Sequence, residues 1–219
     1  MRLLLIITLI LSSSFAQAST IKLNYSVFFG YMKTMYKLDY QYVTTAFYLV
    51  DRNDKNLCAI NNAQMQVERR FEPILFEPEG RLLPYYSDQD RKDGGMLVVD
   101  INDGKNVSSC DLQITVMAKE RELADLNEQK LILISEQLEG VLKKNAGMIG
   151  KYFLPTYAGV RLQLSDTLNA SQRTALGDLV SPINDKQILL HNDNLAVINK
   201  INELNLTVVR ITPWMLSDQ

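Results

Sequence analysis

The first 18 residues determine the compartment in which the rest of the chain folds. Arg2 supplies a short positive region, residues 3–11 form an apolar run, and Ala16-Gln17-Ala18 matches an A-x-A cleavage site. This is the pattern of a secretory signal peptide, and the apolar run is too short to span a membrane. We therefore expect residues 1–18 to be removed and the mature chain to be exported.

The two cysteines, Cys58 and Cys110, both lie in the mature chain. An even number of cysteines in an exported protein is most simply explained by a disulfide. Such a bond would close a loop of about 50 residues and stabilise the fold by roughly 4 kcal/mol in the chain-entropy description. Free or intermolecular thiols and a redox role are the alternatives, but neither cysteine belongs to a C-x-x-C motif that would lower a thiol pKa.

The charge of the chain argues against nucleic acid as a partner. The full chain has 23 Lys and Arg against 25 Asp and Glu, a net charge of −2, and loss of Arg2 with the signal peptide makes it −3. Phosphate binding needs concentrated Lys and Arg, and no long run of like charge occurs. No later segment approaches the roughly 20 apolar residues of a membrane helix.

The first half of the mature chain, residues 19–119, is predicted to be a helix followed by antiparallel strands. The helix covers residues 24–38, and its apolar positions have helical spacing. Three prolines limit residues 71–86 to edge strand or loop, and Asn102-Asp103-Gly104 is predicted to form a turn. Short strands linked by a cysteine pair suggest a sandwich; the expected strands are residues 40–50, 57–60, 63–69, 96–101 and 110–117.

The second half, residues 120–219, is predicted to combine a long helix with a small αβ unit. Asp125 and Glu128 resemble a capping box, and apolar residues then recur at helical spacing for about 20 residues. The remaining elements are a strand at 160–164, a helix at 170–179, a strand at 188–190, a helix at 194–204 and a strand at 207–211. The last three have the order of a βαβ unit. We therefore expect an α+β protein whose two halves meet near residues 119–126 and possess either separate cores or a shared one.

The motifs of several enzyme classes are missing from the chain. His191 is its one histidine, which excludes H-E-x-x-H and Cys/His zinc sites, and no nucleophile elbow or phosphate-binding glycine loop is present. His191 precedes a predicted helix start, so a surface or capping role is expected. Glycosidase chemistry needs two facing carboxylates. The sequence contains pairs such as Glu77 with Glu79 or Asp100 with Asp103, but their presence among 25 acidic residues does not by itself indicate this activity.

Three carboxylates, Asp88, Asp90 and Asp93, fall within six residues. Calcium prefers such oxygen ligands, but the spacing differs from an EF-hand loop and residue 99 is Val where that loop has Glu. We expect a solvated hairpin loop here, and we expect no metal or other cofactor.

The aromatic and methionine side chains of residues 24–38 have two interpretations. They are expected mainly to cover the protein's own core, because Val27, Phe28, Tyr31, Met32 and Met35 share a helical face. If the helix were exposed, the same region would offer an interaction surface. The candidate residues for that surface are Tyr25, Phe28, Tyr31, Met32 and Tyr36.

Several short segments resemble one exported family of Gram-negative bacteria, domain of unknown function 2987. They are Tyr25-Ser26, F-Y-L-V-D at 47–51, Cys58, M-Q-V-E-R at 65–69, C-D-L at 110–112, V-M-A-K-E at 116–120 and the aromatic-Pro stretch 152–155. The resemblance extends over nearly the whole mature chain. It implies a periplasmic location and brings no assigned activity, so no catalytic residue follows from it.

These observations favour a non-enzymatic envelope binding or accessory protein that presents a groove between its halves to a peptide, a glycan or a partner protein. Binding needs only shape and a few polar groups, whereas catalysis needs a constellation of residues that the sequence does not display. The first alternative is a hydrolase of cell-wall or outer-membrane material that uses dispersed carboxylates. The second is a subunit of an envelope complex, which would expose a large apolar patch.

Overall fold

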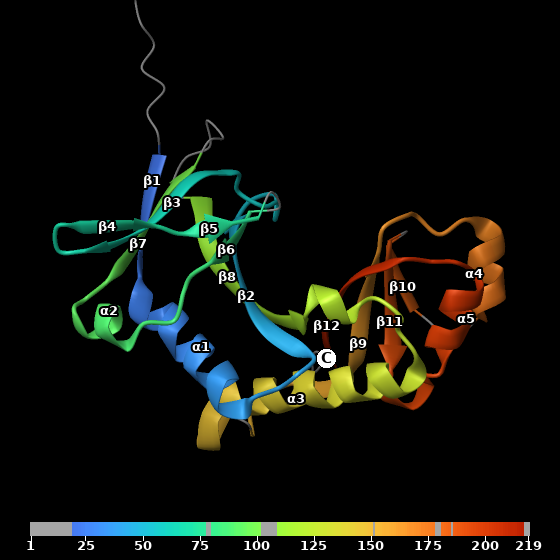
Figure 1. Cartoon of the computed structure of the whole chain (residues 1–219). Helices are drawn as coiled ribbons and strands as arrows, with labels where there is room; N and C mark the ends of the chain where they lie inside the picture. The colour runs from blue at the N-terminus through green and yellow to red at the C-terminus, as the bar shows by residue number, and fades with distance from the viewer. Residues whose placement is uncertain are drawn as a thin grey trace, which may run out of the picture.

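The chain folds into two lobes, which lie side by side with a long helix beneath them (Figure 1). The computed structural model describes residues 19–77, 80–101, 109–150, 152–177, 181–184 and 186–216. The predicted signal peptide, Glu79 and the predicted turn at residues 102–104 lie outside these ranges. Helices and antiparallel sheets are both present, so the α+β class is confirmed. None of the described helices is long and apolar enough to cross a membrane.

The first lobe contains two four-stranded antiparallel sheets. Sheet A has the order β1-β7-β3-β4 and sheet B the order β5-β6-β2-β8. Two sheets agree with the sandwich expected for this half, whereas strand β1 was not predicted. The bounds in sheet A are β1 Ser19–Asn24, β7 Met96–Ile101, β3 Ile60–Val67 and β4 Arg70–Pro73. Those in sheet B are β5 Leu75–Phe76, β6 Arg81–Leu83, β2 Val43–Asp51 and β8 Cys110–Ala118.

A disulfide links Cys58 and Cys110 and fastens the segment before β3 to the start of β8. Both cysteines are buried in the core of the first lobe. The predicted pairing is therefore present.

Helix α1, Tyr25–Leu38, starts where predicted, because the Asn24 side chain accepts a hydrogen bond from the Ser26 amide. Its buried face differs in detail from the expected one. Phe28 and Phe29 enter the first core, while Val27 points outward and is 43% exposed. The aromatic residues thus mainly cover the protein's own core.

The segment of three aspartates was expected to be a hairpin loop, and this expectation is wrong. It forms a short helix, α2 Asp88–Lys92. The Ser87 side chain accepts a hydrogen bond from the Asp90 amide and caps it. Acidic residues in the first turn and basic residues in the last favour a helix at this position. Arg91 and Lys92 form ion pairs with Asp88, which the hairpin prediction did not consider.

The second lobe is one antiparallel sheet covered on one side by helices. Sheet C has the order β10-β11-β9-β12, with β10 Ser181–Asn184, β11 Gln187–His191, β9 Thr156–Leu164 and β12 Val208–Leu216. Helices α4 Ala170–Leu176 and α5 Val197–Glu203 complete the lobe, with 3₁₀ turns at Glu120–Glu122 and Asn192–Asn194. The predicted βαβ unit is split, because β9 lies between β11 and β12 and pairs with both.

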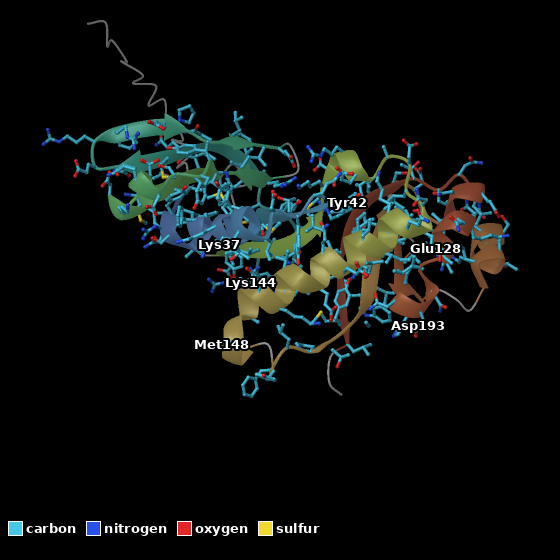
Figure 2. The ribbon with its side chains drawn as sticks, turned by 60° about the horizontal axis from the view of Figure 1, so that its bottom comes forward. Lys37, Tyr42, Glu128, Lys144, Met148 and Asp193 are labelled. Atoms are coloured by element: carbon cyan, nitrogen blue, oxygen red, sulfur yellow. A yellow bond between two sulfur atoms is a disulfide. The ribbon has the colours of Figure 1, made fainter. Side chains whose placement is uncertain are left out.

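Helix α3, Glu128–Gly150, connects the lobes. The expected capping box is wrong: the Asn127 side chain caps the helix by accepting from the Lys130 amide. Its buried face packs on sheet C and on the ends of β2 and β8, which contribute Val43 and Ala118 to the second core. Tyr42 lies beside α3 (Figure 2), and its amide donates to Gln137 Oε1 of that helix at 2.9 Å. Strands β2 and β8 therefore belong to both lobes.

Candidate functional site

The outer face of sheet C carries a polar surface. Residues of β9 alternate, so Val160, Leu162 and Leu164 enter the core and Arg161 and Gln163 point to the opposite face. On β12, Thr212 pairs with Arg161 and Arg210 pairs with Gln163. On β11, Gln187 pairs with Gln163, and its side-chain amide donates to Gln163 Oε1 at 2.9 Å.

Sheet B faces this surface from the first lobe. Tyr48 of β2 pairs with Gln113 of β8, and Ala46 pairs with Thr115, so these side chains share one face of sheet B. Tyr48 and Thr115 line a cavity of about 180 Å³ together with Arg161 and Arg210. We call this space the arginine cavity; Leu57, Gln113, Gln163, Gln187 and Thr212 complete its lining.

A larger cavity adjoins the arginine cavity. Its volume is about 730 Å³, and the two share Tyr48, Gln163 and Arg210. We call it the glutamate cavity, because Glu77 and Glu120 line it; its other residues are Met117, Leu123, Val208 and Val209. Together the two cavities form a cleft with walls from both lobes; the arginine cavity is mainly polar, and the glutamate cavity has mixed polar and apolar walls.

The two glutamates of the cleft are held by one arginine. Arg81 Nη1 lies 3.3 Å from Glu77 Oε1 and 3.0 Å from Glu120 Oε1, and the Arg81 side chain is 11% exposed. Ion pairs in such a partly buried site need good geometry to offset the loss of hydration. This arrangement fixes the position of both carboxylates at the rim of the cleft.

Arg161 and Arg210 differ from Arg81, because neither forms an ion pair with any described residue. The Arg210 guanidinium lies 5.1 Å from the ring centre of Tyr48, within the range of a cation–π contact. Arg161 Nε is shielded from solvent and has no hydrogen-bond acceptor among the described residues. The arginine cavity therefore combines two positive charges with an unfilled donor.

Tyr48 supplies a neutral wall to both cavities. Burial raises the pKa of its hydroxyl above the ordinary value of 10.0, while the charges of Arg210 and Arg81 act in the opposite direction. The hydroxyl donates to Met117 Sδ at 3.6 Å. Tyr48 is thus uncharged at neutral pH and, at 4% exposure, forms a buried part of the wall.

A third pocket lies at α2, outside the cleft. It has a volume of about 890 Å³, and Arg70 forms ion pairs there with both Glu72 and Asp90. Burial, and then the hydrogen bond to Glu72, raise the pKa of Tyr85. Because Arg70 engages both acids, this network ties β4 to α2.

No group of three or more His, Cys, Asp or Glu side chains in the described ranges could hold a metal ion. The three aspartates at α2 have other partners: Asp88 pairs with Arg91, Asp90 with Arg70, and Asp93 with Gln89. His191 is a surface side chain near Asp193, and it contacts the Trp214 ring edge to face.

The predicted interaction surface on α1 is not assembled by the fold. Tyr25 and Phe28 are fully buried and belong to the first core, so they cannot contribute to an exposed surface. Tyr31 and Met32 are half-buried against the same core. Tyr36 is exposed but stacks on Tyr86, with ring centres 5.7 Å apart. The backbone of α3 is kinked at Gly147, which has non-helical dihedral angles. A different group of apolar side chains is exposed after this kink: Met148 (Figure 2), Tyr152 and Phe153.

The sequence indicated one wall of the cleft but not the other. The alternation that predicts β9 also places Arg161 and Gln163 on the face away from the core. No feature of the sequence shows that Tyr48 and Thr115 lie opposite them, because that depends on how β2 and β8 meet sheet C. The cleft residues were therefore missed.

A family model described as a protein of unknown function (DUF2987) matches residues 17–164. The matched segment contains the first lobe, α3 and β9, and thus Arg161 and Gln163, but not β11 or β12. It is shorter than the expected resemblance over nearly the whole mature chain. Comparisons with curated proteins and with solved structures found no match.

Proposed function

The chain belongs to the DUF2987 family of proteins of unknown function, and we propose that it is an exported binding protein of the periplasm that holds a small polar ligand in the cleft between its lobes. The observation that carries this proposal is the cleft itself. The larger of its cavities, about 730 Å³, has the size typical of small-molecule sites, and the smaller one of about 180 Å³ adjoins it. Amide, hydroxyl and charged side chains from both lobes line it.

Export is supported by two features of different kinds. Residues 1–18 have the composition of a signal peptide. The disulfide between Cys58 and Cys110 is of the kind that persists in oxidising compartments such as the periplasm. A bound solute or envelope fragment would be met in that compartment.

The chemistry of the cleft favours binding over catalysis. Neither cavity is lined by a histidine, cysteine or serine from the described residues. Its two carboxylates, Glu77 and Glu120, are engaged by Arg81. A general acid or nucleophile needs a group that is free to exchange a proton or attack a bond.

The hydrolase alternative requires a pair of carboxylates in a cavity, and the α2 pocket contains such a pair, Glu72 and Asp90. Glu72 and Asp90 both form ion pairs with Arg70. Glycosidase chemistry needs two carboxylates that flank the bond to be cleaved, and a shared arginine leaves neither of these two free to do so. We therefore do not propose this activity.

Thr115→Trp provides a direct test. Thr115 lies on the wall of the arginine cavity, and an indole there should fill the space that the ligand needs. The protein should be produced with its own leader in a Gram-negative host, recovered from the periplasm, incubated with envelope extract and weighed by native mass spectrometry. We expect a mature chain that begins at Ser19 and carries a non-covalent added mass in the wild type, which Thr115→Trp lacks.

Thr174→Trp is the matched control, because Thr174 is exposed on α4 and lines neither cavity. It should retain the added mass. An uncleaved leader on a cytosolic product would contradict export. A wild type without added mass, or a Thr115→Trp variant that keeps it, would contradict a ligand site in the cleft.

A further inference from the structure

The two arginines of the arginine cavity lie close together on one sheet face. Arg161 pairs with Thr212, and Arg210 precedes Thr212 by two residues on β12, so the arginines are diagonal neighbours. Such neighbours are roughly 7–8 Å apart, a distance that long side chains bridge. Two like charges at this separation repel each other unless an anion lies between them.

Five other arginines have such an anion. Arg52, Arg70, Arg81, Arg91 and Arg121 each form an ion pair with a carboxylate. Arg161 and Arg210 have none among the described residues, and no Asp or Glu lines the arginine cavity. No described carboxylate therefore pairs with either arginine of the cavity; Glu77 and Glu120, which line the adjoining glutamate cavity, pair with Arg81.

The hydrogen bonding of Arg161 also indicates that an anion binds in this cavity. Its Nε–H is out of contact with solvent and donates to no described acceptor. A buried donor without a partner is costly, and an anionic oxygen is the acceptor that satisfies a guanidinium best. Thr212 and Gln163 lie beside the arginines and offer further donors.

From these observations we infer that the arginine cavity binds the anionic group, a carboxylate or a phosphate, of the ligand. This inference deepens the proposed function and rests on it. The cavity of about 180 Å³ has room for such a group with a few waters, since a water occupies about 30 Å³. The rest of the ligand lies in the glutamate cavity, which shares Tyr48, Gln163 and Arg210 with it.

Titration with defined anions tests the inference on the mature chain. Inorganic phosphate and citrate are added separately, and binding is followed by NMR of the backbone amides and the arginine Nε–H groups. We expect saturable shifts at Arg161, Gln163 and Thr212 with at least one anion. The two titrations show whether phosphate or carboxylate is preferred.

Arg161→Gln and Arg210→Gln should each weaken this binding at least about tenfold, because a charge-assisted contact is lost. Arg69→Gln is the matched control: Arg69 is exposed, lies outside the cleft, and its loss changes the net charge equally. Bound anion should also raise the melting temperature of the wild type and of Arg69→Gln. The amide spectrum of each variant, compared with the wild type, reports whether it is folded.

The inference is overturned if neither anion gives saturable shifts in the wild type, if both glutamine variants bind as tightly as the wild type, or if Arg69→Gln weakens binding equally. Failure of the proposed function is a different result. If both glutamine variants keep the mass captured from envelope extract while Thr115→Trp loses it, the cleft binds a ligand by other contacts. If the wild type captures nothing, the proposed function itself fails.

Discussion

Tyr157 shows how single polar residues secure the second lobe. Its hydroxyl donates to the Ser135 carbonyl at 3.0 Å, and the Ser135 hydroxyl donates to Asn192 Oδ1 at 2.8 Å. This network joins β9, α3 and the turn after β11. Burial raises the pKa of Tyr157 to about 12 from 10.0, and a second hydrogen bond, between the Tyr157 and Ser135 hydroxyls at 2.8 Å, only partly opposes that effect.

A pH dependence follows from the raised pKa of Tyr157. The folded state favours the protonated phenol, so this contribution to stability is complete below pH 10 and is lost as the pH rises through about 12. Tyr157→Phe should cost about 1 kcal/mol near neutral pH, the worth of one hydrogen bond. In urea titrations, the difference in free energy of unfolding between the wild type and Tyr157→Phe should shrink between pH 10 and 12. A difference that stays constant to pH 12 would contradict this prediction.

For single residues, the sequence predicted some helix caps and buried positions correctly and others incorrectly. For α1 the sequence offered Asn24 or Ser26 as the cap and the structure uses Asn24, whereas for α3 the predicted capping box began at Asp125 and the structure uses Asn127. Both residue types cap helices well, and only the path of the chain after the turn at Glu120–Glu122 selects between them. Arg161 could be placed on the outer face of its strand, but its lack of a carboxylate partner depends on residues far away in the sequence.

Gly159 illustrates a constraint at the level of strands. It lies in β9 with φ of +153°, and a Cβ there would overlap the Leu190 carbonyl oxygen of β11. A side chain would have to push two paired backbones apart. Gly30 in α1 is the opposite case, because a Cβ there meets nothing within 4 Å.

Gly159→Ala should therefore destabilise the protein by at least about 2 kcal/mol, because a backbone clash cannot be relieved by a rotamer change. Gly30→Ala is the matched control and should stabilise it by up to about 1 kcal/mol through higher helix propensity. Chemical denaturation of both variants measures the two effects. Similar midpoints for the two variants would show that β9 and β11 are not packed as described.

Elements with a strong period were predicted well, and elements defined by long-range pairing were not. The spacing of Leu131, Ile134 and Leu138 predicted α3, and the alternation of Ala63, Met65 and Val67 predicted β3. Strand β1 was missed because its pairing with β7 joins segments over 70 residues apart. The βαβ order was recognised, but the insertion of β9 between β11 and β12 was not.

At the scale of the whole molecule, the cleft exists because β2 and β8 serve both lobes. One end of the pair lies at the disulfide and the other in the second core, so the face that bears Tyr48 is turned toward sheet C. Local sequence patterns predict each wall separately. They do not predict that the walls meet, because that depends on how α3 packs the two lobes together (Figure 1).

Hydrogen–deuterium exchange with and without the ligand captured from envelope extract is the most direct test of the cleft as the binding site. We expect slower exchange in β8, β9 and β12, whose residues wall the two cavities, and no change in α2 or β4. Protection centred on the α2 pocket around Arg70, with β9 and β12 unchanged, would show that the ligand binds outside the cleft.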